Sequence, residues 1–130
     1  MRSRLRYEAV QKTITPESNI CISVTLSYRE QIYQSSACGS IDGNEVELAA
    51  EACLKAVEQF VQGHFSCQLI EADMLHVLGR PTIVLLVRIP FEGREIEIFG
   101  SCKISSNVLE AAARAALDAT NRYVELVISK

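Results

Sequence analysis

The chain has 130 residues, of which 48% are hydrophobic and 22% are charged, and its net charge at neutral pH is −3. This length suits a single domain that buries roughly two-thirds of the surface its unfolded chain exposes. The negative charge argues against a protein whose main work is to neutralise nucleic-acid phosphates. The sequence has neither the apolar run of about 18 residues that a spanning helix needs nor a signal-peptide core. We expect a cytoplasmic protein that binds neither membranes nor nucleic acids.

The predicted elements begin with three strands and a helix. Strands are expected over 5–14 and 20–28, and a return strand runs through Ile32 and Tyr33 after a turn near 29–30. The second strand is the clearest, because its apolar residues alternate with small residues at the period of a half-buried strand. An apolar stripe at helical spacing then predicts a helix through the segment 46–61.

The same order of elements follows a second time. Strands are predicted over 67–77 and 83–91, with turn chemistry at Glu92 and Gly93 and a return strand through Ile96 and Ile98. An alanine-rich helix is expected to run on to about residue 123. The last apolar residues, Val124, Leu126, Val127 and Ile128, predict a final docked strand.

The two copies align when the sequence is shifted by 63 residues. Positions 4–61 then match 67–124 without a gap, so that Val24 falls on Val87. We therefore predict one α+β domain, residues 1–130, built of two repeated β-β-β-α modules, 4–63 and 67–130, that are related by a pseudo-twofold axis.

Two apolar surfaces lie outside this simple pattern. Val84 and Leu86 add apolar side chains to the second face of their strand, which needs a further cover, and we expect a homodimer. In the last helix, Ala111, Ala115 and Ala119 form a line of small side chains. This line is either a close packing face or simply a good helix former on an exposed side.

The cysteines and histidines give no metal site. An odd, scattered set without a C-x-x-C pair predicts reduced, mostly buried thiols at Cys21, Cys38, Cys53, Cys67 and Cys102. His64 and Cys67 are the only residues at a metal-binding spacing, and zinc needs three or four ligands. We expect no metal and no cofactor.

Both helices have the same predicted start. Asn44 and Asn107 are suitable N-caps, and Glu47 and Glu110 stand three residues on, where a carboxylate can reach back to the cap amide. The chain contains no nucleophile paired with a base and no glycine-rich phosphate loop. We expect that the protein is not an enzyme.

Two helix N-termini related by a pseudo-twofold axis are a candidate ligand locus, because their exposed amides attract a carboxylate. Carboxylates of the first start could accept an ammonium group. The alternative is that the asparagines and glutamates only cap their helices. The candidate ligand-binding residues are Asp42, Asn44, Glu45, Val46, Glu47, Ser105, Ser106, Asn107, Val108 and Leu109.

The segment 105–122 resembles the last helix of a known regulatory domain, the C-terminal domain of isopropylmalate and citramalate synthases. The family pattern there is a small residue, Ser or Thr, Asp, two aliphatics and Glu, followed by an alanine-rich stretch and a late Asn. Gly100 is similar to the family's glycine in the preceding strand, and the segment 43–49 is similar to its first helix start, with Glu47 in place of Asp. The family's duplicated β-β-β-α organisation matches the internal repeat.

This resemblance implies a non-catalytic module that binds an end-product amino acid, leucine or isoleucine, between its modules and across a dimer interface. The expected partners are then a small metabolite, either a branched-chain amino acid or a related acid, and a second copy of the chain. Two alternatives remain open. One is a dimerisation scaffold without a ligand. The other is a double-stranded RNA-binding-like module, although Ser105, Ser106 and Asn107 stand where such a domain carries lysines.

Overall fold

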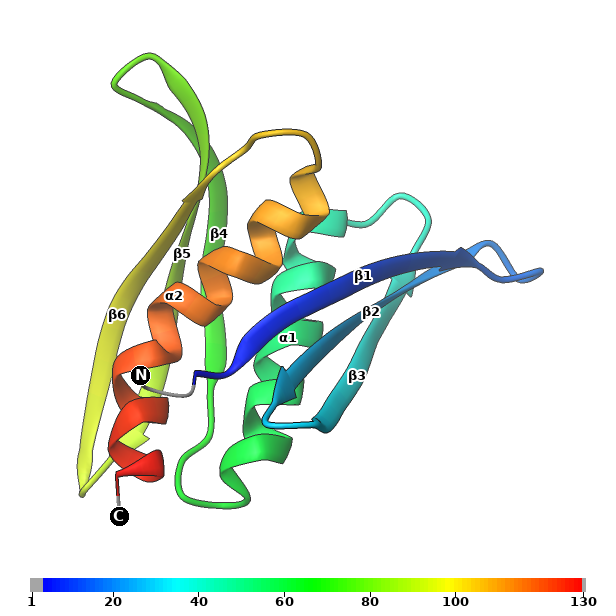
Figure 1. Ribbon diagram of the computed structural model, residues 1–130. Helices are drawn as coiled ribbons and strands as arrows, with labels where there is room; N and C mark the ends of the chain where they lie inside the picture. The colour runs from blue at the N-terminus through cyan, green and yellow to red at the C-terminus, as the bar shows by residue number, and fades with distance from the viewer. Residues whose placement is uncertain (1–3, 130) are drawn as a thin grey trace.

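The computed structural model describes residues 4–129. Eight elements follow one another along the chain (Figure 1). They are β1 (Arg6–Ile14), β2 (Asn19–Tyr28), β3 (Gln31–Ser40), α1 (Glu45–Val61), β4 (Gln68–Val77), β5 (Arg80–Phe91), β6 (Arg94–Lys103) and α2 (Val108–Ile128).

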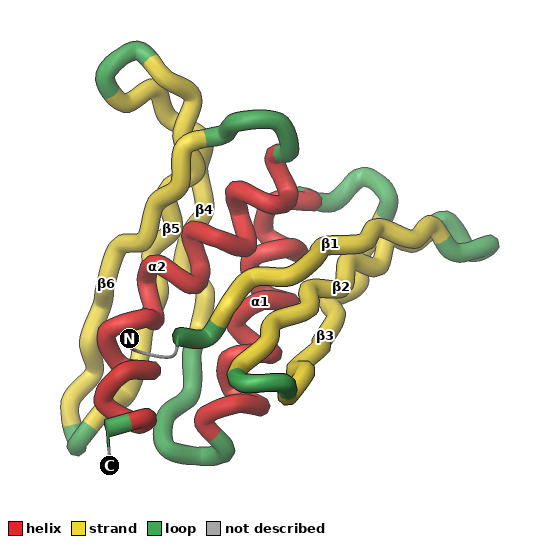
Figure 2. The backbone as a smooth tube through the Cα atoms, in the orientation of Figure 1, coloured by secondary structure: helices red, strands yellow, loops and turns green. Residues whose placement is uncertain are grey.

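Two antiparallel sheets lie on either side of a central pair of helices (Figures 1 and 2). Their strand orders are β1-β2-β3 and β4-β5-β6, so β2 and β5 are the middle strands. Helix α1 packs on β2 and β3, α2 packs on β5 and β6, and the helices pack against each other. Each first strand also contacts the helix of the other module, β1 with α2 and β4 with α1. The predicted α+β class with two β-β-β-α modules is confirmed.

The two hairpins β2–β3 and β5–β6 keep the predicted shift of 63 residues. Val24 pairs with Ser35, and Val87 pairs with Ile98. Both valines are fully buried in the middle of their sheets. The shift extends to side-chain packing, because Tyr28 and Phe60 meet with ring centroids 5.0 Å apart and the corresponding rings of Phe91 and Tyr123 lie 5.3 Å apart.

The first strands do not keep this shift, so the gapless alignment is wrong there. Gln11 of β1 pairs with Ser23, whereas the residue that pairs with Leu86 is Glu71, sixty rather than sixty-three residues after Gln11. The turn lengths explain the difference. Five residues, 15–19, separate the last paired residues of β1 and β2, and only residues 78–79 separate those of β4 and β5.

Helix α2 lies unusually close to its own sheet at Gly100 of β6. A Cβ placed on this glycine would stand 2.2 Å from the carbonyl oxygen of Ala115 and 2.6 Å from the Cβ of Ala119. Ala111, Ala115 and Ala119 are all buried. The alanine line is therefore a close packing face, as the first of its two interpretations predicted.

The end of the chain is helical rather than extended, so the predicted final strand is wrong. Helix α2 continues to Ile128, five residues past its predicted end, and Val124 is 2% exposed. No glycine or proline interrupts this stretch. Val124, Val127 and Ile128 recur at helical spacing, and this packing outweighs the preference of β-branched residues for strands.

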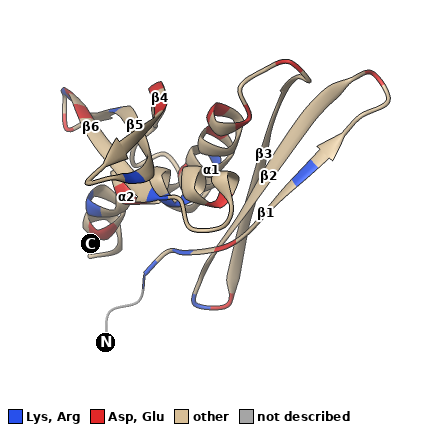
Figure 3. Ribbon diagram, turned by 90° about the horizontal axis from the view of Figure 1, so that it is seen from above, with Lys and Arg blue, Asp and Glu red and all other residues tan. Residues whose placement is uncertain are grey.

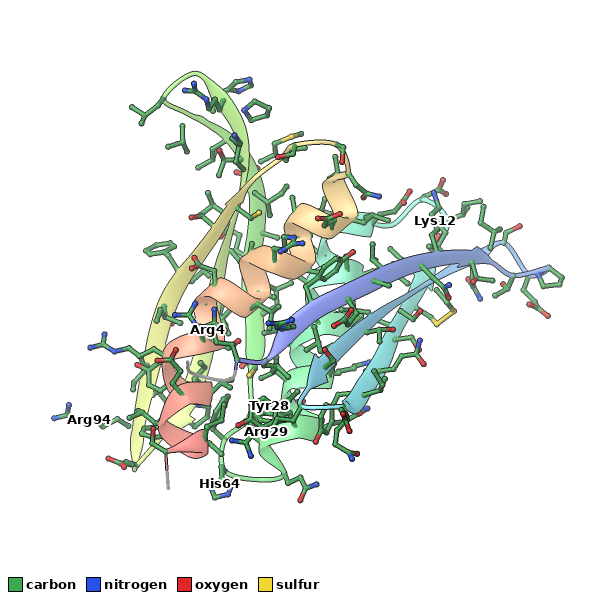
Figure 4. The ribbon with its side chains drawn as sticks, in the orientation of Figure 1. Arg4, Lys12, Tyr28, Arg29, His64 and Arg94 are labelled. Carbon is green, nitrogen blue, oxygen red and sulfur yellow. A yellow bond between two sulfur atoms is a disulfide. The ribbon has the colours of Figure 1, made fainter. Side chains whose placement is uncertain are left out.

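One disulfide contradicts the expectation of five reduced thiols. Cys21 and Cys38 are direct partners on β2 and β3, with their Cα atoms 4.1 Å apart, and are bonded through sulfur (Figure 4). The strand register places the two side chains directly opposite each other, which brings their sulfur atoms within bonding reach. The remaining three cysteines are free. Cys53 is buried as predicted, and Cys67 and Cys102 are half-buried.

Candidate ligand-binding site

The predicted asparagine caps are confirmed at both helix starts. The side-chain oxygen of Asn44 accepts hydrogen bonds from the amides two and three residues further on, at 3.0 and 3.3 Å. Asn107 does the same at 2.8 and 3.2 Å. Two amides of each first turn are thus satisfied within the protein by the cap side chain.

The start of α1 is held to the first sheet. The carboxylate of Glu45 forms an ion pair with Lys12 of β1, with 3.0 Å between Nζ and Oε1. Val46 is half-buried, and Asp42 and Glu47 are exposed. The predicted residues of this start are therefore engaged mainly in ordering α1 itself.

The start of α2 opens into a pocket of about 250 Å³, which we call the α2 pocket. Its walls include Ser105, Ser106 and Asn107 from the predicted set, together with the cations Lys103 and Arg114. Serine hydroxyls, a helix N-terminus and the positive charge of Lys103 favour an anion, while the charge of Arg114 is partly balanced by Glu110, which also lines the pocket. The α2 pocket is thus chemically suited to a carboxylate.

Arg114 is held in place by two contacts. Its Nε donates to Oε2 of Glu110 at 2.9 Å, and its guanidinium lies 4.7 Å from the ring centre of Tyr7. The Glu110 carboxylate therefore pairs with Arg114 one turn on, rather than with the amide of Asn107 as predicted. Burial, together with the charge of Glu110, raises the pKa of the Tyr7 phenol, while Arg114 opposes this shift. The phenol accordingly stays neutral at physiological pH.

The α2 pocket contains residues from only one of the two predicted helix starts. Ser105, Ser106 and Asn107 line it, whereas no residue from 42–47 does. Val108, which is 38% exposed, and the half-buried Leu109 follow directly in the first turn but do not line the pocket.

Sequence reasoning missed Lys103 and Arg114. Lys103 ends β6, and Arg114 stands four residues after Glu110, at the spacing of a helical ion pair. This spacing could have indicated that Arg114 pairs with Glu110 at the start of the helix. It did not reveal that the side chain also faces β1 across the domain.

The outer face of the second sheet carries an apolar hollow of about 310 Å³. Val84 and Leu86 of β5 are half-buried there, and Phe99 of β6 is 71% exposed. Glu71 and Asp73 of β4 border the hollow. These carboxylates lie on the exposed face, where single charges are normally solvated.

Neither a metal cluster nor a membrane-spanning helix occurs in the described part of the chain. Residues 4–129 bring together no group of three His, Cys, Asp or Glu side chains that could hold a metal ion. Within the same range, no helix is both long and apolar enough to cross a membrane.

Comparison of the sequence with protein-family models and with curated proteins finds no match. The resemblance of the α2 segment to the regulatory domain of isopropylmalate and citramalate synthases therefore stays a prediction.

Proposed function

We propose that the protein is a non-catalytic regulatory module that binds a small carboxylate metabolite in the α2 pocket. The observation that carries this proposal is the convergence of Lys103, Arg114 and the first turn of α2 on one pocket. The proposal includes the relation of the two modules by a pseudo-twofold axis and the resemblance to the amino-acid-sensing domain of isopropylmalate and citramalate synthases.

The charges of the α2 pocket favour a carboxylate. A guanidinium and an ammonium group provide charge-assisted donors, and the positive end of the helix dipole contributes up to about 2 kcal/mol in a partly buried site. Glu110 also lines the pocket. Its carboxylate can accept an ammonium group, so the pocket offers both halves of the recognition that an amino acid needs.

A second part of the proposal is a homodimer formed by the outer face of the second sheet. Val84, Leu86 and Phe99 expose apolar surface there, and such surface is stabilised when a second apolar face covers it.

The expected compartment, the cytoplasm, remains part of the proposal. Reducing conditions there would open the Cys21–Cys38 disulfide. The backbone pairing of β2 with β3 extends over ten residue pairs on both sides of these cysteines. This pairing should hold the sheet together without the sulfur bond.

The ligand is tested by thermal melting and calorimetric titration with leucine, isoleucine, valine and their keto acids. A bound ligand should raise the melting temperature, and the rise should grow with ligand concentration. The variant Lys103→Gln should weaken binding about tenfold, because it removes one charge-assisted contact. The matched control Arg94→Gln changes a cation that Figure 4 shows pointing away from the domain and should leave binding unchanged.

Absence of both heat and stabilisation at millimolar concentrations, with the chain still dimeric, would favour the dimerisation scaffold over the regulatory module. Equal loss of affinity in Lys103→Gln and Arg94→Gln would place the ligand elsewhere on the surface.

A further inference from the structure

A second hollow, of about 440 Å³, lies between the beginning of β1 and the solvent side of α2. Three arginines line it, Arg4, Arg6 and Arg114, and we call it the arginine groove. Figure 4 places Arg4 beside α2, and Figure 3 shows the basic segments at the beginning of β1 next to those of α2. We propose that the arginine groove binds a small free dianion of the phosphate monoester class, at a site distinct from the α2 pocket.

The charge balance of the arginine groove opposes that of the whole chain. Three arginines and one acidic residue, Asp118, line the groove in a protein whose net charge is −3, while Glu125 and Glu110 pair with Arg4 and Arg114 from beside it. Asp118 is already engaged, because its Oδ2 accepts a hydrogen bond from the amide of Ser101 at 2.9 Å. A cleft lined by one sign of charge concentrates ions of the opposite sign.

The three guanidinium groups differ in how far they are neutralised. Arg6 forms no ion pair with any residue between 4 and 129, and it is exposed. Arg4 lies 3.8 Å from the carboxylate of Glu125, and both side chains are partly exposed. Arg114 uses its Nε for Glu110. The guanidinium of Arg6 therefore keeps its full charge for a ligand. The two terminal amino groups of Arg114 are also available.

Arg114 is also preorganised. The contact with the Tyr7 ring and the bond to Glu110 fix the plane of its guanidinium. A fixed planar fork loses less conformational entropy when it binds an oxyanion than a mobile lysine does. The neutral phenol of Tyr7 and the side-chain amide of Asn121 line the same groove and add uncharged donors.

Size and donor number together point to a phosphate group. The volume lies within the range typical of small-molecule sites. A monocarboxylate offers two oxygens and one charge, whereas a phosphate monoester offers three terminal oxygens and close to two charges at neutral pH. The phosphate monoester is therefore the better match for a groove lined by three arginines. Leu5 and Leu117, both nearly buried, provide an apolar floor for the remainder of the ligand.

Arg114 lines both the arginine groove and the α2 pocket. An anion in the groove would neutralise part of the Arg114 charge and so reduce the positive charge available to a ligand in the α2 pocket. Binding of a phosphate monoester should therefore alter the affinity of the α2 pocket for its own ligand, and linkage requires the converse effect to be equal.

Calorimetric titration with glycerol phosphate and with inorganic phosphate tests the proposal, at constant ionic strength and with acetate as the monoanion. We expect dissociation constants below about 1 mM for the phosphates, a free energy of about −4 kcal/mol, and at least tenfold weaker binding of acetate. Arg6→Ala should weaken phosphate binding about tenfold, since a hydrogen-bonded charge is lost. The control Arg94→Ala should change it less than twofold. Arg114→Lys keeps the charge but loses the fork, and an intermediate affinity is expected.

Three results would overturn the proposal. The first is no phosphate binding at a phosphate concentration about 10-fold above the expected dissociation constant. The second is equal phosphate affinity of the variants Arg6→Ala and Arg94→Ala. The third is binding to phosphatidic-acid vesicles without binding of the free phosphates. Thermal melting of each variant excludes unfolding as the cause of a lost signal. These titrations use no amino acid, so they can fail or succeed independently of the α2 pocket.

Discussion

The two modules share a hairpin register but differ in what their sheets turn outward. The cross-strand pair Ser23–Ser36 of the first sheet corresponds to the pair Leu86–Phe99 of the second. Next to it, the disulfide Cys21–Cys38 corresponds to Val84 and Ser101. The same backbone thus carries a polar outer face in one module and an apolar one in the other. The contiguous apolar face of the second sheet is the basis of the proposed dimer, because such patches typically mark protein–protein contacts.

The modules differ on the inner side as well. Ala37 of β3 faces α1, and the corresponding residue of β6 is Gly100, which faces α2. Because Gly100 lacks the methyl group of Ala37, the backbone of α2 at Ala115 and the side chain of Ala119 can lie directly against β6. The second module is therefore packed more closely against its helix while presenting the more apolar outer face.

The largest expected effect tests the close approach of α2. Gly100→Ala should destabilise the protein by about 3 kcal/mol or more, because the added Cβ would meet the backbone of Ala115 and force the helix to shift. The reciprocal change Ala37→Gly should cost only about 1 kcal/mol, through backbone entropy. Chemical denaturation of both variants measures the difference, and similar losses would mean that the two modules pack alike.

The second effect concerns the outer faces. Leu86→Asp should weaken the proposed dimer about a hundredfold, because an unpaired charge in an apolar interface costs several kcal/mol. Ser23→Asp changes the corresponding position of the first sheet and should leave the oligomeric state unaltered. Light scattering across a dilution series reads out both variants. A monomeric unmodified chain at tens of micromolar, or equal effects of the two changes, would refute the assignment of this face.

The success and failure of the sequence predictions follow from how local each signal is. The alternation in β2, the turn residues and the asparagine caps act over a few residues, and these features were predicted correctly. The shift between β1 and β4 is three residues smaller than the predicted shift, because the turn after β1 is three residues longer than the turn after β4. The gapless alignment did not reveal this difference in turn length. The Cys21–Cys38 disulfide could have been found, since a turn centred on residues 29–30 places these two cysteines opposite each other.

The candidate site was predictable only in part. Ser105, Ser106 and Asn107 follow from the cap pattern, and they do line a pocket. Arg114 contributes through its contact with Tyr7, which is more than one hundred residues away in the sequence. Such a meeting depends on how the two modules pack together, and no periodicity within either module encodes it.

The smallest expected effect concerns the asparagine caps at the two helix starts. Asn44→Ala and Asn107→Ala should each cost about 1 kcal/mol of stability, because each cap satisfies two amides. Neither change alone can distinguish a cap from a ligand contact.

The variant Asn107→Asp makes that distinction. Aspartate retains the acceptor for the first-turn amides and suits the helix dipole, so stability should stay within about 0.5 kcal/mol of the unmodified protein. The same substitution adds a negative charge to the wall of the α2 pocket, where it would repel a carboxylate and compete for Lys103. We therefore expect at least tenfold weaker amino-acid binding, about 1.4 kcal/mol. The matching change Asn44→Asp, at the start that does not line the pocket, should leave binding unaltered. Titration of both variants alongside thermal melting measures the two effects, and equal affinities would remove Asn107 from the ligand site.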